Sequence, residues 1–255
     1  MISPIASNTF YLVKKRVDMS YGSMNTKELA RFLGFDARQL ERDAQRGTIP
    51  CRKVRGQLLF NRSEIHDWLQ QSMITMNSDT LEQVDGGITT HRQTEQDQAI
   101  IVPLLRQSAI TTHLDARTKG SVLRKLLALA QTTDLIYDND ALLESVQERE
   151  ELQSTAIDLG IAIVHPLQPQ PYTIADTVFV VAKSPQKIIF GAPDGSLTDL
   201  FFFIAAQDSH QHLHLLARLC RMLQDPYFVE ELKEAQTQQR MRELLIEREA
   251  IVIAC

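Results

Sequence analysis

The chain has 255 residues, of which 44% are hydrophobic and 23% are charged, with a net charge of −5. This composition is that of an ordinary globular protein, and the length suits one large domain or two smaller ones. No apolar run reaches the roughly 18 residues that a membrane-spanning helix needs, and residues 1–20 lack the apolar core and cleavage site of a secretory signal. The cysteines at positions 51, 220 and 255 fit neither a disulfide framework nor a zinc site. We therefore expect a cytoplasmic protein without membrane insertion.

The charge is distributed unevenly along the chain. Residues 1–73 carry 12 Lys and Arg against 7 Asp and Glu, a net charge of +5, whereas the remainder carries −10. Such opposition favours two parts with different partners. A basic part can bind nucleic acid, although small domains often carry a few surplus charges without doing so.

Four segments are expected. They are a flexible leader (residues 1–23), a compact module (24–73), a polar linker with little periodicity (74–98) and a larger domain (99–252). Met19 and Met24 are alternative starts to Met1.

The compact module begins with two short helices. Asn25 and Glu28 have the spacing of a capping box, and the helix that they start should end at Gly34. Asp36 then caps a second helix, which should end at Gly47. Two short helices joined by a turn that contains glycine predict a helix-turn-helix.

A hairpin and a third helix complete the predicted module. Residues 52–60 read as two strands with Gly56 at the tip, and Asn61 or Ser63 caps a closing helix. The whole run, MNTKELARFLGFDARQLERDAQRGTIPCRKVRGQLLFNRSEIHDWL, resembles the excisionase-like and MerR-like winged helix-turn-helix modules. That resemblance implies that the second helix enters the major groove of duplex DNA while the hairpin touches the backbone.

Six basic residues are the candidates for DNA contact. Three lie four residues apart on one face of the second helix, and three lie on the hairpin: Arg38, Arg42, Arg46, Arg52, Lys53 and Arg55. Arginines there could reach phosphates or guanine edges. The alternative is a solvated basic face, softened by Glu41 and Asp43, on a module that docks another protein.

The larger domain alternates predicted helices and strands. Helices are expected over 121–131, 139–152 (capped by Asn139 or Asp140), 210–223 and 227–247, and strands over 160–164, 177–182 and 200–206. This order predicts an α/β sandwich, with a mixed sheet flanked by helices.

The segment 149–165, REELQSTAIDLGIAIVH, brings reactive groups together. It holds Arg149 at a helix end, the Ser154-Thr155 pair and a short apolar strand that ends at His165. An imidazole is largely neutral near pH 7, so a solvent-facing ring at a strand end has a nitrogen free to attack phosphorus. A lone histidine in such a place is more often structural, so the spacing of the surrounding residues has to decide between a structural and a reactive role.

That spacing is similar to the type-2 enzyme IIA domain of the bacterial phosphotransferase system, in its fructose, mannitol and nitrogen-regulatory branch. The family reads roughly R-E-x-x-x-S-T-G-I-G-N-G-I-A-I-P-H, and the resemblance covers residues 98–250, including GAPDGSLTDLFFFIAAQDSHQHLHLLARL. It implies that His165 is phosphorylated, that His212 and Arg149 complete the catalytic site, and that Ser154 and Thr155 bind the phosphate. It also implies a histidine phosphocarrier protein as donor and a IIB component as a possible acceptor.

The sequence departs from the family pattern at four positions. Ala156, Asp158, Leu159 and Val164 stand where the family has Gly, Gly, Asn and Pro. The expectation is that Asp158 brings a negative charge close to an incoming phosphoryl group and weakens transfer by repulsion.

We expect no metal and no cofactor. His210 and His214 have an i, i+4 spacing that can bind zinc, but no acidic or cysteine ligand is evident beside them. A histidine-to-histidine relay needs neither a metal nor a nucleotide.

Taken together, the sequence favours a cytoplasmic bacterial regulator in which the winged-helix module binds DNA and the type-2 enzyme IIA domain reports phosphotransferase status. The chain is then a phosphotransferase if His165 is competent. Two alternatives stay open. One is a sugar-uptake component whose first module docks a protein, and the other is an interaction protein that is never phosphorylated.

Overall fold

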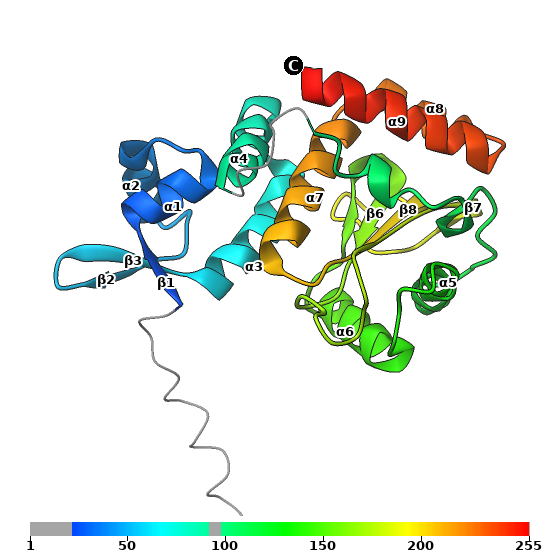
Figure 1. The fold of residues 1–255 in the computed structure, drawn as a ribbon, viewed down its shortest axis with the longest axis horizontal. Coiled ribbons are helices and arrows are strands. Elements are labelled where there is room, and N and C mark those ends of the chain that lie inside the picture. Colours follow the sequence, from blue (N-terminus) through cyan, green and yellow to red (C-terminus); the bar gives the residue numbers. More distant parts are fainter. Residues whose placement is uncertain (1–21, 92–97, 255) are drawn as a thin grey trace, which may run out of the picture.

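The computed structural model describes residues 22–91 and 98–254 of the chain. A small N-terminal module lies beside a larger α/β domain, and helices of both parts meet between them (Figure 1). Most of the expected leader lies in residues 1–21, outside the described residues.

The N-terminal module is a winged helix-turn-helix. Its elements are β1 (Ser23–Asn25), α1 (Thr26–Leu33), α2 (Ala37–Gln45), β2 (Arg52–Val54), β3 (Gln57–Asn61) and α3 (Arg62–Ser72). The capping box forms as predicted, because the Asn25 side chain accepts from the Glu28 N–H at 3.0 Å and Glu28 accepts from the Asn25 N–H at 2.8 Å. Gly34 ends α1 in the left-handed conformation, at φ 70°.

Antiparallel pairing of β3 with both β2 and β1 forms the wing. Arg55 and Gly56 turn the β2–β3 hairpin with φ values of 50° and 84°, the backbone that a two-residue hairpin turn requires. The short β1 was not expected from the sequence. Asn61 caps α3 by accepting from the N–H groups of Ser63 and Glu64.

The segment expected to be a linker contains a helix. After the short 3-10 helix η2 (Met73–Thr75), α4 spans Ser78–His91 and buries Leu81, Val84 and Ile88. These three residues form its apolar face, and Gly86-Gly87 lowers helix propensity. The stability of α4 therefore depends on packing against α1 and α7. A Cβ built on Gly87 would lie 2.3 Å from the Gly34 nitrogen, so glycine is what lets α4 cross α1 this closely.

A mixed sheet forms the centre of the α/β domain, in the order β4-β7-β8-β6-β5. Its strands are β4 (Ile110–Thr111), β5 (Ala156–Ile157), β6 (Ile161–Val164), β7 (Val178–Ile188) and β8 (Thr198–Ala205). β6 runs parallel to β8, and β4 runs parallel to β7, whereas β7 with β8 and β5 with β6 are antiparallel. The mixed sheet between helices confirms the predicted fold class.

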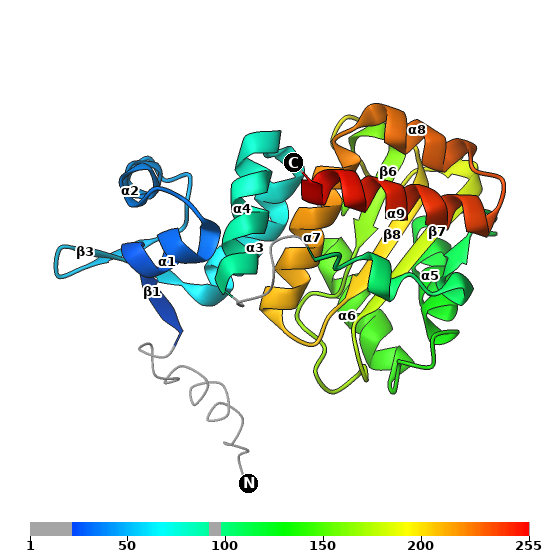
Figure 2. The same cartoon turned by 45° about the horizontal axis from the view of Figure 1, so that its top comes forward.

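Helices cover both faces of this sheet (Figures 1 and 2). Residues of α5 (Lys119–Gln131) and α6 (Asn139–Leu152) pack on one face, and α7 (Ser209–Leu223), α8 (Pro226–Glu234) and α9 (Gln238–Ala254) pack on the other. Short 3-10 helices complete the domain: η3 (Val102–Leu104), η4 (Gln107–Ala109) and η5 (Asp158–Gly160).

Two expected helix details in this domain were wrong. Asp138, not Asn139 or Asp140, caps α6 by accepting from the Ala141 N–H. The single helix expected over 227–247 is divided between α8 and α9. The backbone leaves the helical conformation at Ala235, with ψ 125°, and the Lys183 side chain of β7 donates to the carbonyls of Lys233 and Ala235 there.

The hydrophobic core is continuous between the two parts of the chain. One cluster joins Leu29 and Leu33 of α1 through Val84 of α4 to Leu216 of α7 and Phe202 of the sheet. A second cluster fills the space between the sheet and α5 and α6. The N-terminal module is therefore packed on the α/β domain through α3 and α4.

Candidate functional site

Two parallel strands bring the candidate histidines together. The carboxyl ends of parallel strands meet at one edge of a sheet, and β6 and β8 are such a pair. His165 follows β6 directly, while β8 leads into the Asp208 cap of α7, whose first turns carry His212. The two rings lie with their centroids 5.0 Å apart.

Backbone contact fixes which nitrogen of His165 is reactive. Nδ1 lies 2.9 Å from the Ile163 carbonyl, which can only accept, so Nδ1 carries the hydrogen. Nε2 therefore holds the lone pair, and it accepts from the Nε–H of Arg149 at 3.1 Å. Burial, with a smaller contribution from the Arg149 charge, lowers the pKa of His165 to about 3. The ring is thus neutral at physiological pH, with Nε2 as a nucleophile.

Arg149 lies in the last turn of α6, and a hydrogen bond to the following backbone segment holds its guanidinium in place. It is 5% exposed, and its Nη1 donates to the Gln153 carbonyl at 2.8 Å. Burial lowers its pKa, against the opposing effects of the Glu150 and Asp67 carboxylates. A buried guanidinium with a planar set of donors is suited to phosphoryl oxygens.

His212 has an unused polar atom in this site. Its Nε2 is buried and has no hydrogen-bond partner among the residues that the structure describes, although buried polar atoms are rarely left in that state. Burial, followed by the neighbouring His165, His66 and Arg149, lowers the pKa of His212 well below its ordinary value. The neutral ring can thus hydrogen-bond to a group that enters the site.

The expected solvent-facing position of His165 was wrong, because the ring is only 1% exposed. Helix α3 of the N-terminal module covers it. Gln70 Oε1 lies 3.2 Å from His165 Nε2, and Gln70 Nε2 lies 3.0 Å from His66 Nδ1. The His66 ring centroid lies 5.6 Å from that of His212. A neutral His165 favours the amide orientation that turns the Gln70 N–H toward Nε2. The walls of the site are thus polar rather than apolar.

Ser154 and Thr155 support the loop beside β6. The Ser154 hydroxyl donates to the Phe190 carbonyl at 3.0 Å, and the Thr155 hydroxyl donates to the Glu150 carboxylate at 2.6 Å. Glu150 also accepts from Lys119 at 2.8 Å. The sequence reasoning missed Glu150 and Lys119, and it missed His66 and Gln70 because they lie about 80 to 100 residues away in the sequence.

Comparison with protein families assigns both parts of the chain. Residues 103–248 match the family described as phosphoenolpyruvate-dependent sugar phosphotransferase system, EIIA 2, and residues 23–73 match the helix-turn-helix domain family. The chain belongs to the EIIA type 2 family. The EIIA match covers more than half of the chain, and the helix-turn-helix module is an addition to it.

Relatives of known class match the EIIA domain. A fructose-specific EIIA component of Haloferax volcanii is 30% identical over 153 residues, which are 59% of this chain and 96% of the relative. A nitrogen regulatory protein of Bradyrhizobium diazoefficiens is 30% identical over 149 residues, 57% of this chain and 94% of the relative.

A solved structure shares the fold of the EIIA domain. The nitrogen regulatory protein IIA-Ntr from Neisseria meningitidis superposes with a TM-score of 0.52 at 21% identity and covers 58% of this chain and 99% of its own. In the part of the chain that the structure describes, no helix is both long and apolar enough to cross a membrane.

Asp158 does not lie close to His165, where its negative charge was expected from the sequence. It belongs to the exposed turn η5 at the start of β6, whereas His165 follows the end of that strand. Strands rise about 3.3 Å per residue, so the four residues of β6 separate the two ends by about 13 Å. The expected position of Asp158 close to the phosphoryl group was therefore wrong, and the expected weakening of transfer stays a prediction.

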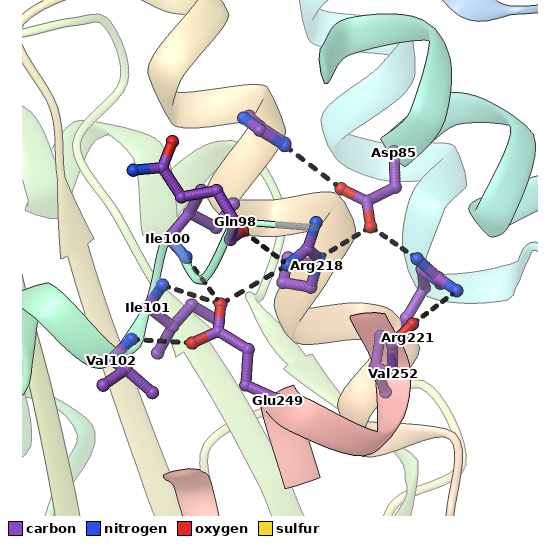
Figure 3. Close-up of polar contacts among 10 residues, drawn as sticks. Asp85, Gln98, Ile100, Ile101, Val102, Arg218, Arg221, Glu249 and Val252 are labelled. Atoms are coloured by element: carbon purple, nitrogen blue, oxygen red, sulfur yellow. Dashed lines mark hydrogen bonds and ion pairs between the residues drawn. The ribbon is translucent and has the colours of Figure 1, made fainter. Parts of the chain in front are cut away.

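His214 does not join His212 in the site, because it faces α4. Its Nε2 lies 3.3 Å from the buried carboxylate of Asp85, which also accepts from Arg218 at 2.7 Å and Arg221 at 2.6 Å (Figure 3). We call these four residues the Asp85 cluster. Hydrogen bonds from His214 and the two arginines keep the pKa of Asp85 below its ordinary value against the effect of burial, so the carboxylate is ionised.

Arg218 also connects the cluster to the C-terminal helix. Its Nη1 lies 3.5 Å from the buried Glu249 of α9, and Glu249 accepts the N–H groups of residues 100–102 at 2.7 to 2.8 Å (Figure 3). The start of the EIIA domain, α4, α7 and α9 thus share one network of buried charges.

The six basic candidates of the N-terminal module are all exposed. They lie on α2 and on the β2–β3 hairpin, at the end of the molecule farthest from the EIIA sheet (Figures 1 and 2). Some contact acidic or polar neighbours: Arg42 donates to Gln39 at 2.6 Å, and Arg52 pairs with Glu64 at 2.6 Å. Packing against the EIIA domain therefore leaves this basic face open.

Proposed function

We propose that the chain accepts a phosphoryl group on His165 from a histidine phosphocarrier protein, and that its helix-turn-helix module binds duplex DNA as part of a cytoplasmic regulator. The observation that carries the first part is the neutral Nε2 of His165, buried between the Arg149 guanidinium and His212. The exposed basic face of α2 and the wing supports the second.

In the proposed step, the Nε2 lone pair attacks the phosphorus of a phosphohistidine on the donor. A P–N bond forms on Nε2, the P–N bond of the donor breaks, and the donor ring leaves with that electron pair. His165 Nδ1–H keeps its hydrogen bond to Ile163 throughout. Arg149, whose Nε–H contacts Nε2 before the reaction, can then donate to the phosphoryl oxygens, and the unpartnered His212 Nε2 can bind another.

A IIB component is a candidate second partner. A solved complex joins the mannitol enzyme IIA of Escherichia coli to its phosphorylated enzyme IIB, and that structure superposes on this chain with a TM-score of 0.51 at 21% identity, covering 56% of this chain and 97% of its own. Transfer to such a partner is compatible with the regulator. The alternative is a sugar-uptake component whose N-terminal module docks a protein instead of DNA.

Phosphorylation is tested by incubating the full chain to completion with phosphoenolpyruvate, enzyme I and the phosphocarrier protein, then measuring intact mass. We expect the mass of one phosphoryl group on the wild-type chain and none on His165→Ala. His113→Ala, which changes an exposed histidine outside the site, should be labelled like the wild type. A wild-type chain that stays unlabelled, together with an unlabelled Gln70→Ala variant, would remove the proposed acceptor role.

A further inference from the structure

Helix α3 occupies the space that a phosphoryl group on His165 needs. The Gln70 amide lies 3.2 Å from Nε2, the atom with the reactive lone pair. Phosphorylation would place a phosphorus atom and three oxygens on that atom, where the amide now lies. Gln70 itself is 3% exposed and His66 is 8% exposed, so both side chains are buried in the site while α3 stays in place.

The same helix also blocks the approach of a donor. An in-line transfer needs the donor nitrogen on the far side of the phosphorus, and in this arrangement that path runs into α3. With His165 at 1% and His212 at 4% exposure, a protein partner cannot reach either ring until α3 moves.

A cavity borders α3, whereas buried ion pairs attach α4 to α7. A cavity of about 500 Å³ lies between α3 and the EIIA domain, lined among others by Ile65, His66 and Asp67 on one side and Leu167, Pro169 and Leu213 on the other. In contrast, α4 is attached to α7 by the buried Asp85 cluster. The module is thus fixed through α4, while α3 has free space beside it.

We propose that α3 is an intramolecular competitor for the phosphorylation site: the donor must displace it, and a phosphoryl group on His165 keeps it displaced. This inference rests on the proposed acceptor role of His165. The basic face on α2 and the wing is exposed while α3 covers the site. Phosphorylation therefore acts on the module by displacing α3 from the EIIA site while α4 stays attached through the Asp85 cluster, not by uncovering the basic face.

Access to His165 is tested with diethyl pyrocarbonate, which acylates accessible neutral imidazoles, at pH 7 with peptide mapping. The test variant is Gln70→Arg, which places a second cation beside Arg149 and repels α3 from the site. The matched control is Gln71→Arg, the same substitution at the exposed neighbouring position. We expect His165 to react at least about tenfold more slowly than exposed His113 in the wild type and in the control, and at least about tenfold faster in Gln70→Arg than in Gln71→Arg.

The same chains are then compared in the initial rate of phosphorylation. The competition predicts a faster rate in Gln70→Arg, and in the milder Gln70→Ala, than in Gln71→Arg. Equal reactivity of His165 and His113 in the wild type would overturn the inference, as would phosphorylation at one rate in all variants. Absence of phosphorylation from every chain, with the acylation difference intact, would instead overturn the proposed function. Circular dichroism of Gln70→Ala and Gln70→Arg separates release of α3 from unfolding.

Discussion

Three histidines from three helices or strand ends share one buried polar site, and each is in its neutral form. His165 and His212 come from the EIIA domain, and His66 comes from α3. Burial is the largest cause of the lowered pKa in all three. Neutrality leaves Nε2 of His165 nucleophilic, but it also makes the closed site sensitive to acid.

The stability of the chain should therefore fall below about pH 6.5, the unfolded pKa of histidine. There the unfolded chain binds protons that the buried rings, with His165 at a pKa of about 3, do not accept, so unfolding becomes more favourable as the pH decreases. His165 alone should cost about 1 kcal/mol between pH 7.5 and pH 5.5. Urea unfolding at these two pH values measures the difference. This difference in the free energy of unfolding should be smaller in His165→Gln but not in His113→Gln. An unchanged difference in His165→Gln would contradict the lowered pKa of His165.

Leu159 is strained where the EIIA pattern has asparagine. Its φ of 61° lies in the left-handed region, and the side chain is 45% exposed. Asparagine tolerates this backbone better than leucine, so Leu159→Asn should raise the free energy of unfolding by about 1 kcal/mol. Urea denaturation measures it. Leu197→Asn, at a similarly exposed leucine (43%) outside the positive-φ positions, should give no such gain, and equal effects at both positions would rule out backbone strain as the cause.

At the scale of elements, α3 and α4 each have two roles. Helix α3 closes the helix-turn-helix module with Ile65 and Leu69, and on the neighbouring face it presents His66 and Gln70 to the EIIA site. Helix α4 packs on α1 and on α7. The module and the EIIA domain therefore share helices at their interface, instead of being joined by a free linker.

The Asp85 cluster should be essential for docking α4. Asp85→Ala leaves the buried Arg218 with Glu249 as its remaining carboxylate and removes the carboxylate that pairs with the partly buried Arg221, and breaking a buried ion pair from one side costs about 3–5 kcal/mol. Asp79→Ala, at an exposed position on the same helix, should change stability by less than about 0.5 kcal/mol. Chemical denaturation compares the two variants, and similar small losses in both would show that the cluster does not hold the helix.

At the scale of the whole molecule, the exposed basic residues lie at one end, and the proposed phosphorylation site lies where α3 meets the EIIA domain. The basic residues lie beyond α1, far from the EIIA sheet (Figure 1). Between them, the core runs without interruption from the helix-turn-helix to β8. A chemical change at His165 thus has a packed route to the module through α3 and α7.

Binding of the full chain to duplex DNA of arbitrary sequence should weaken steeply with salt, because basic side chains displace counterions from phosphates. Replacing Arg38 by alanine should reduce the slope of log K against log salt by about 0.9 if the side chain contacts one phosphate. Arg117→Ala, at an exposed position of the EIIA domain, is the matched control and should keep the wild-type slope. Fluorescence anisotropy gives these slopes. DNA binding that is absent, or equally steep for Arg38→Ala and the wild type, would favour a protein-docking module.

The sequence by itself determined the local structure and the residue types of the candidate site. Capping at Asn25 and Asp36, the turn at Gly56 and the apolar strand before His165 are read from neighbours within a few residues, and the structure has each of them. Local patterns suffice there because helix caps, turns and strand periodicity depend on short-range contacts.

Only the tertiary structure decided the burial of His165, the helical state of α4 and the remote position of Asp158. Gln70 meets His165 across 95 residues, and Asp85 meets Arg218 across 133. The segment of α4 has a weak apolar face and forms a helix only because α1 and α7 pack on it. Asp158 and His165 lie at opposite ends of β6, so the direction of this strand separates Asp158 from the site. Such outcomes depend on which surfaces find each other in three dimensions, and spacing along the chain does not contain that information.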